Sequence, residues 1–278
     1  MDSARSTPDA AAAAFRERYG LGIAPIRDII QVVEDCCDVL VITREFPAAY
    51  EAFTVQVDDP AITVIGVGIS DNYERQRFSI AHELGHIESG RASAEIHAMP
   101  DYERNPDEIW ADNFARHLLL PIASVEKNLA GAGRSRHDLT IKSLSDLVRV
   151  FGVSPPVAMI QLRDSGWIAK TDSSGWSEAH HPLTSRSLAM KYGWDSERDA
   201  MVNASLTPRR PTRLVSAATS AYQDGKASLE AVAQAAGEKN LEQFQSKLRE
   251  SGITVGQAAA KEPKLEAEDL SDLYRGSE

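Results

Sequence analysis

The chain has 278 residues, of which 42% are hydrophobic and 26% are charged, and its formal net charge is −11. This balance is typical of a globular protein with room for one domain and a smaller second unit. The net negative charge argues against direct binding of nucleic acid, because phosphates repel such a surface. No stretch reaches the run of about 20 apolar residues that a membrane span requires.

The N-terminal segment, residues 1–19, lacks the apolar core that a signal peptide carries. Cys36 and Cys37 are adjacent in a segment typical of a helix, where a disulfide between neighbours would be strained. We therefore expect reduced thiols and a cytoplasmic protein with no membrane partner.

In chain order, residues 8–19 and 25–37 are predicted helices, separated by the break Gly20-Leu21-Gly22. Short runs rich in β-branched residues at 39–43, 52–57 and 62–67 are predicted strands. The turn Asp58-Asp59-Pro60 predicts that the last two strands pair as a hairpin.

The motif His82-Glu83-Leu84-Gly85-His86 follows, in a helix predicted to begin near Asn72. Residues four apart lie on one helical face, so His82 and His86 can both aim an imidazole at one Zn²⁺. Glu83 lies beside them and can act as the base toward water activated by that ion. The motif predicts one zinc ion per chain, which Mn²⁺ or another divalent ion can replace in the cell.

A third ligand is expected from a helix predicted at 107–119. In it Glu108, Asp112 and Ala115 form one stripe, with Ala111 just beside it, so this small face can pack against the motif helix while Glu108 reaches the metal. Asp112 then faces the site and can accept the free ring N–H of a ligand histidine. Acidic residues in the first turn after an Asn105 cap are also common at the start of any helix. Glu108 can belong to such a helix start and bind the metal as well.

Less suited histidines stand elsewhere, at positions 97, 117, 137, 180 and 181. His117 is nine residues after Glu108 and should face the opposite side of the helix. Residues 91–104 are predicted to connect the two helices over the site, and further helices are predicted near 122–130, 140–150 and 155–165.

Two segments together resemble the ImmA/IrrE family of bacterial metallopeptidases. They are Arg75-Gln76-Arg77-Phe78-Ser79-Ile80-Ala81-His82-Glu83-Leu84-Gly85-His86 and Glu108-x-x-Ala111-x-x-Phe114-Ala115-x-x-Leu118-Leu119-Leu120-Pro121, and the resemblance spans roughly residues 10–170. It implies that His82, His86 and Glu108 are zinc ligands and that Glu83 is the catalytic acid and base. It also implies a cytosolic protease that cleaves helix-turn-helix repressors and so switches on mobile-element or stress-response genes. The chain departs from the family at His117, often acidic there, and at Asp112, where Asn is common.

Beyond residue 169 the composition changes. Residues 170–187 are typical of a linker or surface loop, and 188–252 are predicted to form a helical unit, with helices opening at 209–214 and spanning 228–236 and 241–251. This unit resembles a helix-turn-helix bundle, but a packing subdomain explains it as well. The basic cluster Arg209, Arg210 and Arg213 is most simply a solvated helix start, and residues 256–278 are a predicted disordered acidic tail.

The sequence thus predicts an α+β protein. A helix-rich, zincin-like metallopeptidase domain with a small sheet spans residues 8–169, and a small all-helical unit follows. One predicted strand is expected to lie beside the zinc helix and to bind the substrate backbone by strand addition. Arg77, His97 and Tyr102 are the candidates for stabilising the oxyanion, and the sequence does not choose among them. The alternative function is a metal-containing binding protein, part of a toxin–antitoxin pair or a repressor-binding module, that does not cut its partner.

Overall fold

The computed structural model describes residues 6–46, 51–58, 61–90, 105–133, 139–169 and 183–255. They divide into two compact units, with the boundary between Pro211 and Thr212. The first unit is a helix-rich α+β domain, as the sequence predicts, and the second contains helices alone. None of the described helices is both long and apolar enough to cross a bilayer.

The first unit begins with two helices, α1 (Pro8–Arg18) and α2 (Ile29–Cys37). Helix α2 begins four residues later than predicted, because the Asp28 side chain accepts a hydrogen bond from the backbone N–H of Gln31 and so caps the helix at this point. The helix ends at Asp38, which adopts a left-handed conformation with φ of 56°. This turn leads the chain directly into the first strand.

Three strands form one sheet: β1 (Val39–Arg44), β2 (Ala52–Asp58) and β3 (Ala61–Gly68). Their order is β1-β3-β2, with β1 parallel and β2 antiparallel to β3. The predicted hairpin is therefore confirmed, although residues 59–60 of its turn lie outside the described part of the chain. Strand β2 forms one edge of the sheet, and Thr43 of β1 makes a short antiparallel bridge with Arg209 at the other edge.

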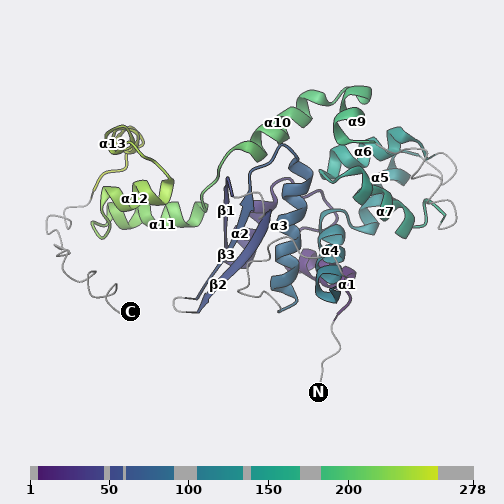
Figure 1. The fold of residues 1–278 in the computed structure, drawn as a ribbon, viewed down its shortest axis with the longest axis horizontal. Coiled ribbons are helices and arrows are strands. Elements are labelled where there is room, and N and C mark those ends of the chain that lie inside the picture. The colour runs from purple at the N-terminus through teal and green to yellow at the C-terminus, as the bar shows by residue number, and fades with distance from the viewer. Residues whose placement is uncertain are drawn as a thin grey trace, which may run out of the picture. The chain divides into compact units, whose positions relative to one another are not determined.

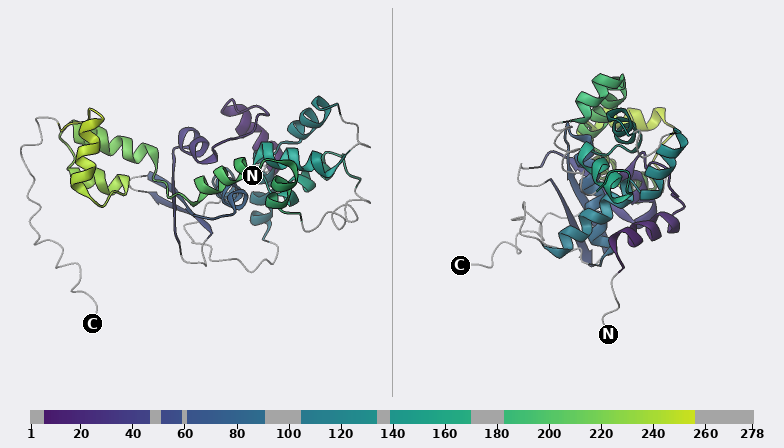
Figure 2. Two further views of the ribbon diagram at one scale, coloured as in Figure 1. Left: turned by 90° about the horizontal axis from the view of Figure 1, so that it is seen from above. Right: turned by 90° about the vertical axis from the view of Figure 1, so that its right-hand side faces the viewer.

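Two helices follow the sheet: α3 (Tyr73–Glu88), which carries His82, Glu83 and His86, and α4 (Pro106–Leu119), which carries Glu108. The sheet, α3 and α4 lie side by side in Figure 1, and α1 packs on α4. In the left view of Figure 2, α1 and α2, in purple, lie along one side of the unit. Fully buried apolar side chains from these elements, including Phe15, Val41, Ile65, Leu84 and Phe114, belong to one core.

Three of the remaining helices match predicted positions: α5 (Ile122–Gly131), α6 (Ile141–Phe151) and α7 (Pro155–Asp164). A further helix, α9 (Ser185–Tyr192), was not predicted and begins inside the predicted linker of residues 170–187. Residues from 188 onward were expected to belong to the C-terminal unit, but α9 and the next helix, α10 (Asp195–Leu206), belong to the first unit. The reason is burial: Leu188, Ala189 and Trp194 lie in its core, and the Trp194 indole N–H donates to Ser145 Oγ of α6. Residues 170–182 of the predicted linker lie outside the described part.

The second unit contains α11 (Thr212–Gln223), α12 (Leu229–Ala236) and α13 (Leu241–Glu250). Side chains of Ser228 and Asn240 cap the last two helices, and Gly237 ends α12 with a φ of 74°. A small core of Tyr222, Val232, Ala233, Phe244 and Leu248 holds the three together. The predicted tail at 256–278 lies outside the described residues.

Candidate metal centre

The apolar side of α3 packs into the core, so the motif histidines on its other side face away from the core. The Asn72 side chain caps it by accepting from the Arg75 backbone N–H at 3.0 Å. Ile80, Ala81 and Leu84 are buried in the core, with at most 1% of their surface exposed. His82 and His86 therefore lie along the opposite, partly open side, with 18% and 13% of their side-chain surface exposed.

Gly85 lets α4 approach α3 closely. A Cβ at Gly85 would lie 3.1 Å from Ala111 Cα and 3.2 Å from Phe114 Cδ1, which is tighter than ordinary van der Waals contact. Ala111 contributes only a methyl group on the other side of this contact. Because Glu108 lies about one turn before Ala111, the close approach brings its carboxylate to the two histidines.

The three side chains expected to bind metal converge. His82 Nε2 lies 3.0 Å from Glu108 Oε2, and His86 Nε2 lies 3.3 Å from Glu108 Oε1. The two Nε2 atoms are 3.0 Å apart. One donor atom from each residue falls within 4.8 Å of the others, and this trio is the only such group of His, Cys, Asp and Glu among the described residues.

Asp112 fixes the orientation of His82. The Nδ1–H of His82 donates to Asp112 Oδ1 at 2.8 Å, which leaves Nε2 directed toward the cluster. Burial acts to lower the pKa of His82, but the hydrogen bonds to Asp112 and Glu108 outweigh it and raise this pKa to about 9. The same histidines, through their hydrogen bonds, lower the pKa of Glu108 below its usual value. The cluster is thus arranged around a carboxylate that remains ionised.

Glu83 has a hydrogen-bond partner that the sequence did not reveal. The hydroxyl of Thr54 on β2 donates to Glu83 Oε2 at 2.6 Å, and Thr54 is 4% exposed. This contact spans 29 residues and depends on the packing of β2 against α3. The only local signal was the position of Thr54 in a predicted strand, which says nothing of what its side chain touches.

The donor set suits a divalent ion. Two imidazole nitrogens and one carboxylate oxygen lie on neighbouring helices, and such a set leaves a fourth position of a tetrahedral ion open. The Asp112 hydrogen bond provides the outer support that metal-bound histidines usually have. The residues present therefore fit a catalytic rather than a closed structural metal site.

Arg77, one candidate for the oxyanion partner, makes its hydrogen bonds with backbone carbonyls instead. Its guanidinium donates to the backbone carbonyls of Ile26 at 2.6 Å, Arg27 at 2.8 Å, Gly152 at 3.1 Å and Phe151 at 3.3 Å. Burial lowers the pKa of Arg77, and the nearby Tyr73, Asp28 and Glu74 act in the opposite direction. Arg77 is thus a structural residue that ties α3 to the segments before α2 and after α6, whereas His97 and Tyr102 lie outside the described residues.

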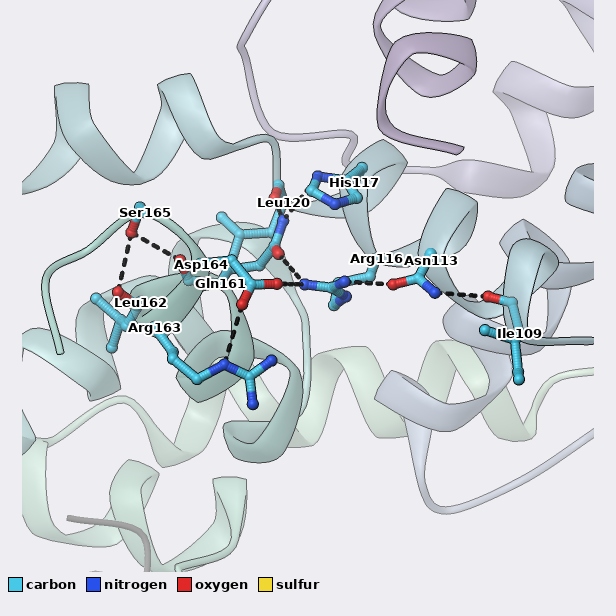
Figure 3. A network of polar contacts seen from close by, with 10 residues as sticks. All are labelled: Ile109, Asn113, Arg116, His117, Leu120, Gln161, Leu162, Arg163, Asp164 and Ser165. Carbon is cyan, nitrogen blue, oxygen red and sulfur yellow. Dashed lines mark hydrogen bonds and ion pairs between the residues drawn. The ribbon is translucent and has the colours of Figure 1, made fainter. Parts of the chain in front are cut away.

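His117 faces away from the metal cluster, as its position on α4 predicts. It accepts a hydrogen bond from Gln161 Nε2 at 3.4 Å, and burial lowers its pKa. Figure 3 shows the network to which it belongs, in which Arg116 of α4 donates to Gln161 Oε1 at 2.6 Å and pairs with Asp164 at 2.5 Å. Gln161 is fully buried on α7, so this network anchors the C-terminal end of α4. His137, His180 and His181 lie outside the described part of the chain.

The comparison with known proteins agrees with this geometry. Residues 34–163 match the family model Peptidase_M78, described as the IrrE N-terminal-like domain. Curated proteins give no match to the chain. The matched segment contains the whole sheet, α3 and α4, and hence Thr54, Glu83 and the three clustered donors. Residues 34–163 therefore form an IrrE N-terminal-like domain of the Peptidase_M78 type, and the clustered His82, His86 and Glu108 lie within it.

Proposed function

We propose that this protein is a cytoplasmic, zinc-dependent endopeptidase that cleaves a helix-turn-helix repressor and thereby derepresses mobile-element or stress-response genes. The observation that carries the proposal is the convergence of His82, His86 and Glu108, with Glu83 next to them on the same helix. Zinc is favoured over harder ions because two imidazoles and one carboxylate are a common zinc donor set.

The chain's own residues divide the chemistry among them. His82, His86 and Glu108 would hold the ion, and Asp112 would keep the His82 ring in its ligating orientation. When bound, the ion supplies a Lewis acid that polarises the scissile carbonyl and acidifies water. Glu83 accepts the proton of the water that attacks the carbonyl carbon, and it then delivers this proton to the amine as the C–N bond breaks.

Strand β2 is the proposed site of substrate binding. It is the edge strand beside α3, and the Thr54–Glu83 hydrogen bond places the middle of the strand near the base. At the other edge, Thr43 of β1 exchanges both backbone hydrogen bonds with Arg209 at 3.1 Å, so that edge is already partly used. An extended segment of the substrate adding to β2 would have its backbone directed by main-chain hydrogen bonds.

The proposed partner follows from the family to which the domain belongs. A broad protease in the cytoplasm would damage the cell that makes it, so specificity must come from a narrow cleft or from docking outside it. The net charge of −11 favours a protein substrate over direct contact with DNA.

The test is incubation of the purified, zinc-loaded chain with the helix-turn-helix protein encoded beside it, followed by electrophoresis and mass spectrometry of the fragments. Cleavage at one or a few sites is expected from the wild-type chain and not from the Glu83→Gln variant. Tight binding without cleavage by the wild-type chain would instead support the repressor-binding or toxin–antitoxin module. Neither binding nor cleavage would reject the proposed partner.

A further inference from the structure

Thr54 occupies an unusual place between the sheet and the motif helix. Its side chain is buried and its hydroxyl donates to Glu83 Oε2 at 2.6 Å. Glu83 is next to His82 on α3, yet its carboxylate is held by the strand rather than by a residue of α3 or α4. A hydrogen bond to a carboxylate is stronger than one between neutral groups, so it restricts where that carboxylate can point.

The backbone of Thr54 has a defined direction too. The Gly68 N–H donates to the Glu51 carbonyl at 2.9 Å, so residues 51 and 68 form a hydrogen-bonded antiparallel pair. The register continues without a break as Ala52↔Val67, Phe53↔Gly66 and Thr54↔Ile65. Because hydrogen-bonded and non-hydrogen-bonded pairs alternate, Thr54↔Ile65 is a non-hydrogen-bonded pair.

It follows that the N–H and C=O of Thr54 point away from β3, toward the outer edge of β2. The same alternation directs the backbone groups of Ala52 and Gln56 to that edge. Within the described part of the chain, these outward N–H and C=O groups form no hydrogen bond with another element. An extended chain that adds to β2 would therefore pair with Thr54 itself.

We propose that Thr54 is a positioning residue with two functions: its hydroxyl orients the base Glu83, and its backbone binds the extended substrate at the same point. The residue that holds the substrate strand then also sets the direction of the base, and the scissile bond is placed within reach of Glu83. This inference rests on the proposed peptidase function, and it adds β2 residues 52, 54 and 56 as the substrate-binding edge.

The first test compares Thr54→Val, which keeps the shape but removes the hydroxyl, with Thr54→Ser, which keeps the donor. Cleavage of the adjacent helix-turn-helix protein is measured as separate kcat and KM values, and zinc content is measured alongside. Thr54→Val should lower kcat by roughly tenfold to a hundredfold, within the range that general base catalysis contributes, with KM and zinc content unchanged. Thr54→Ser should restore most of the rate. Wild-type kcat in Thr54→Val, loss of zinc, or no recovery in Thr54→Ser would each overturn the positioning function.

A second measurement needs no substrate. A double-mutant cycle of Thr54→Val and Glu83→Ala, read by denaturant unfolding, isolates the interaction between the two side chains. The hydrogen bond predicts a coupling of roughly tenfold in the unfolding equilibrium constant. Additive effects would show that the hydroxyl does not hold the carboxylate. If the cycle shows coupling but the wild-type chain cleaves nothing, the proposed function fails while the contact stands.

The backbone function is tested at Gln56, an exposed residue whose N–H points to the same edge. Proline is tolerated on an edge strand where the N–H faces outward, so Gln56→Pro should fold while removing one donor for the substrate. KM should rise with kcat little changed, and the rise should exceed any change in Gln56→Ala, which loses the same side chain but keeps the N–H. Equal KM in Gln56→Pro and Gln56→Ala would overturn the assignment of this edge.

Discussion

The two halves of α3 carry polar residues for different purposes. In the N-terminal half, Arg77 is partly buried, and four of the five N–H donors of its guanidinium bind backbone carbonyls. In the C-terminal half, His82 and His86 remain partly exposed and contact one another and acidic side chains of α4. Polar groups that face backbone hold the fold together, whereas polar groups that face other side chains at an open surface are available for chemistry. Changes in the two halves should therefore separate stability from activity.

The largest expected effect is on the chemical step. Glu83→Gln keeps the size of the side chain and its ability to accept the Thr54 hydrogen bond, but it removes the base. We expect cleavage of the proposed repressor substrate to fall by roughly a thousandfold or more, because proton transfer from water and to the leaving amine is lost together. Zinc content and the unfolding midpoint should match those of the wild type, and an active Glu83→Gln protein would contradict the mechanism.

Metal affinity should show the next largest effect. Glu108→Ala removes one of three donors, and zinc affinity should fall by more than about a hundredfold, since even residues that only support a ligand account for about 10- to 100-fold. Asp112→Ala is the matched comparison on the same helix and should fall within that smaller range. Competition with a chelating indicator measures both. Full zinc affinity in Glu108→Ala would show that the third ligand is another residue.

In the N-terminal half, the expected loss is in stability. Arg77→Met keeps apolar volume but leaves the carbonyls of Ile26, Arg27, Phe151 and Gly152 without their donor, which should cost about 3 kcal/mol in the free energy of unfolding. Arg75→Met is the control: its ion pair with Glu51 is exposed, and its loss should cost less than about 1 kcal/mol. Chemical denaturation measures both values. A destabilised Arg77→Met protein should still bind zinc when folded. A loss of zinc affinity in the folded variant would contradict the assignment of stability to the N-terminal half and metal binding to the C-terminal half.

The smallest effect is expected from the second unit, which contributes none of the clustered donors. Deleting residues 212–278 should leave the unfolding midpoint of the first unit close to its original value. If the second unit serves in docking, the same deletion should raise the KM for the proposed repressor and leave kcat unchanged. Deleting residues 188–278 removes the buried Leu188, Ala189 and Trp194 as well, and should cause severe destabilisation. Thermal unfolding separates the two truncations. Unchanged KM in the shorter deletion would reject docking, and its unfolding would show that the second unit supports the first.

Much of the site was predictable because it lies on two helices near each other in sequence. The spacing of His82 and His86 fixes their common face, and the stripe of Glu108 and Asp112 is fixed in the same way by helical periodicity. Helix starts such as Asn72 were predictable from capping chemistry. The α+β class and the β2–β3 hairpin followed from local patterns of apolar and turn residues.

Tertiary packing alone decided the rest. The parallel pairing of β1 with β3, the contact of Thr54 with Glu83 and the four carbonyls around Arg77 all join residues distant in sequence. The same holds for Leu188 and Trp194, whose burial assigns α9 and α10 to the first unit rather than to the second. Periodicity tells which face of an element is apolar, and it therefore determines that the element packs and which side chains share a face. It does not tell which other element meets that face, because this depends on how all the apolar faces are buried together.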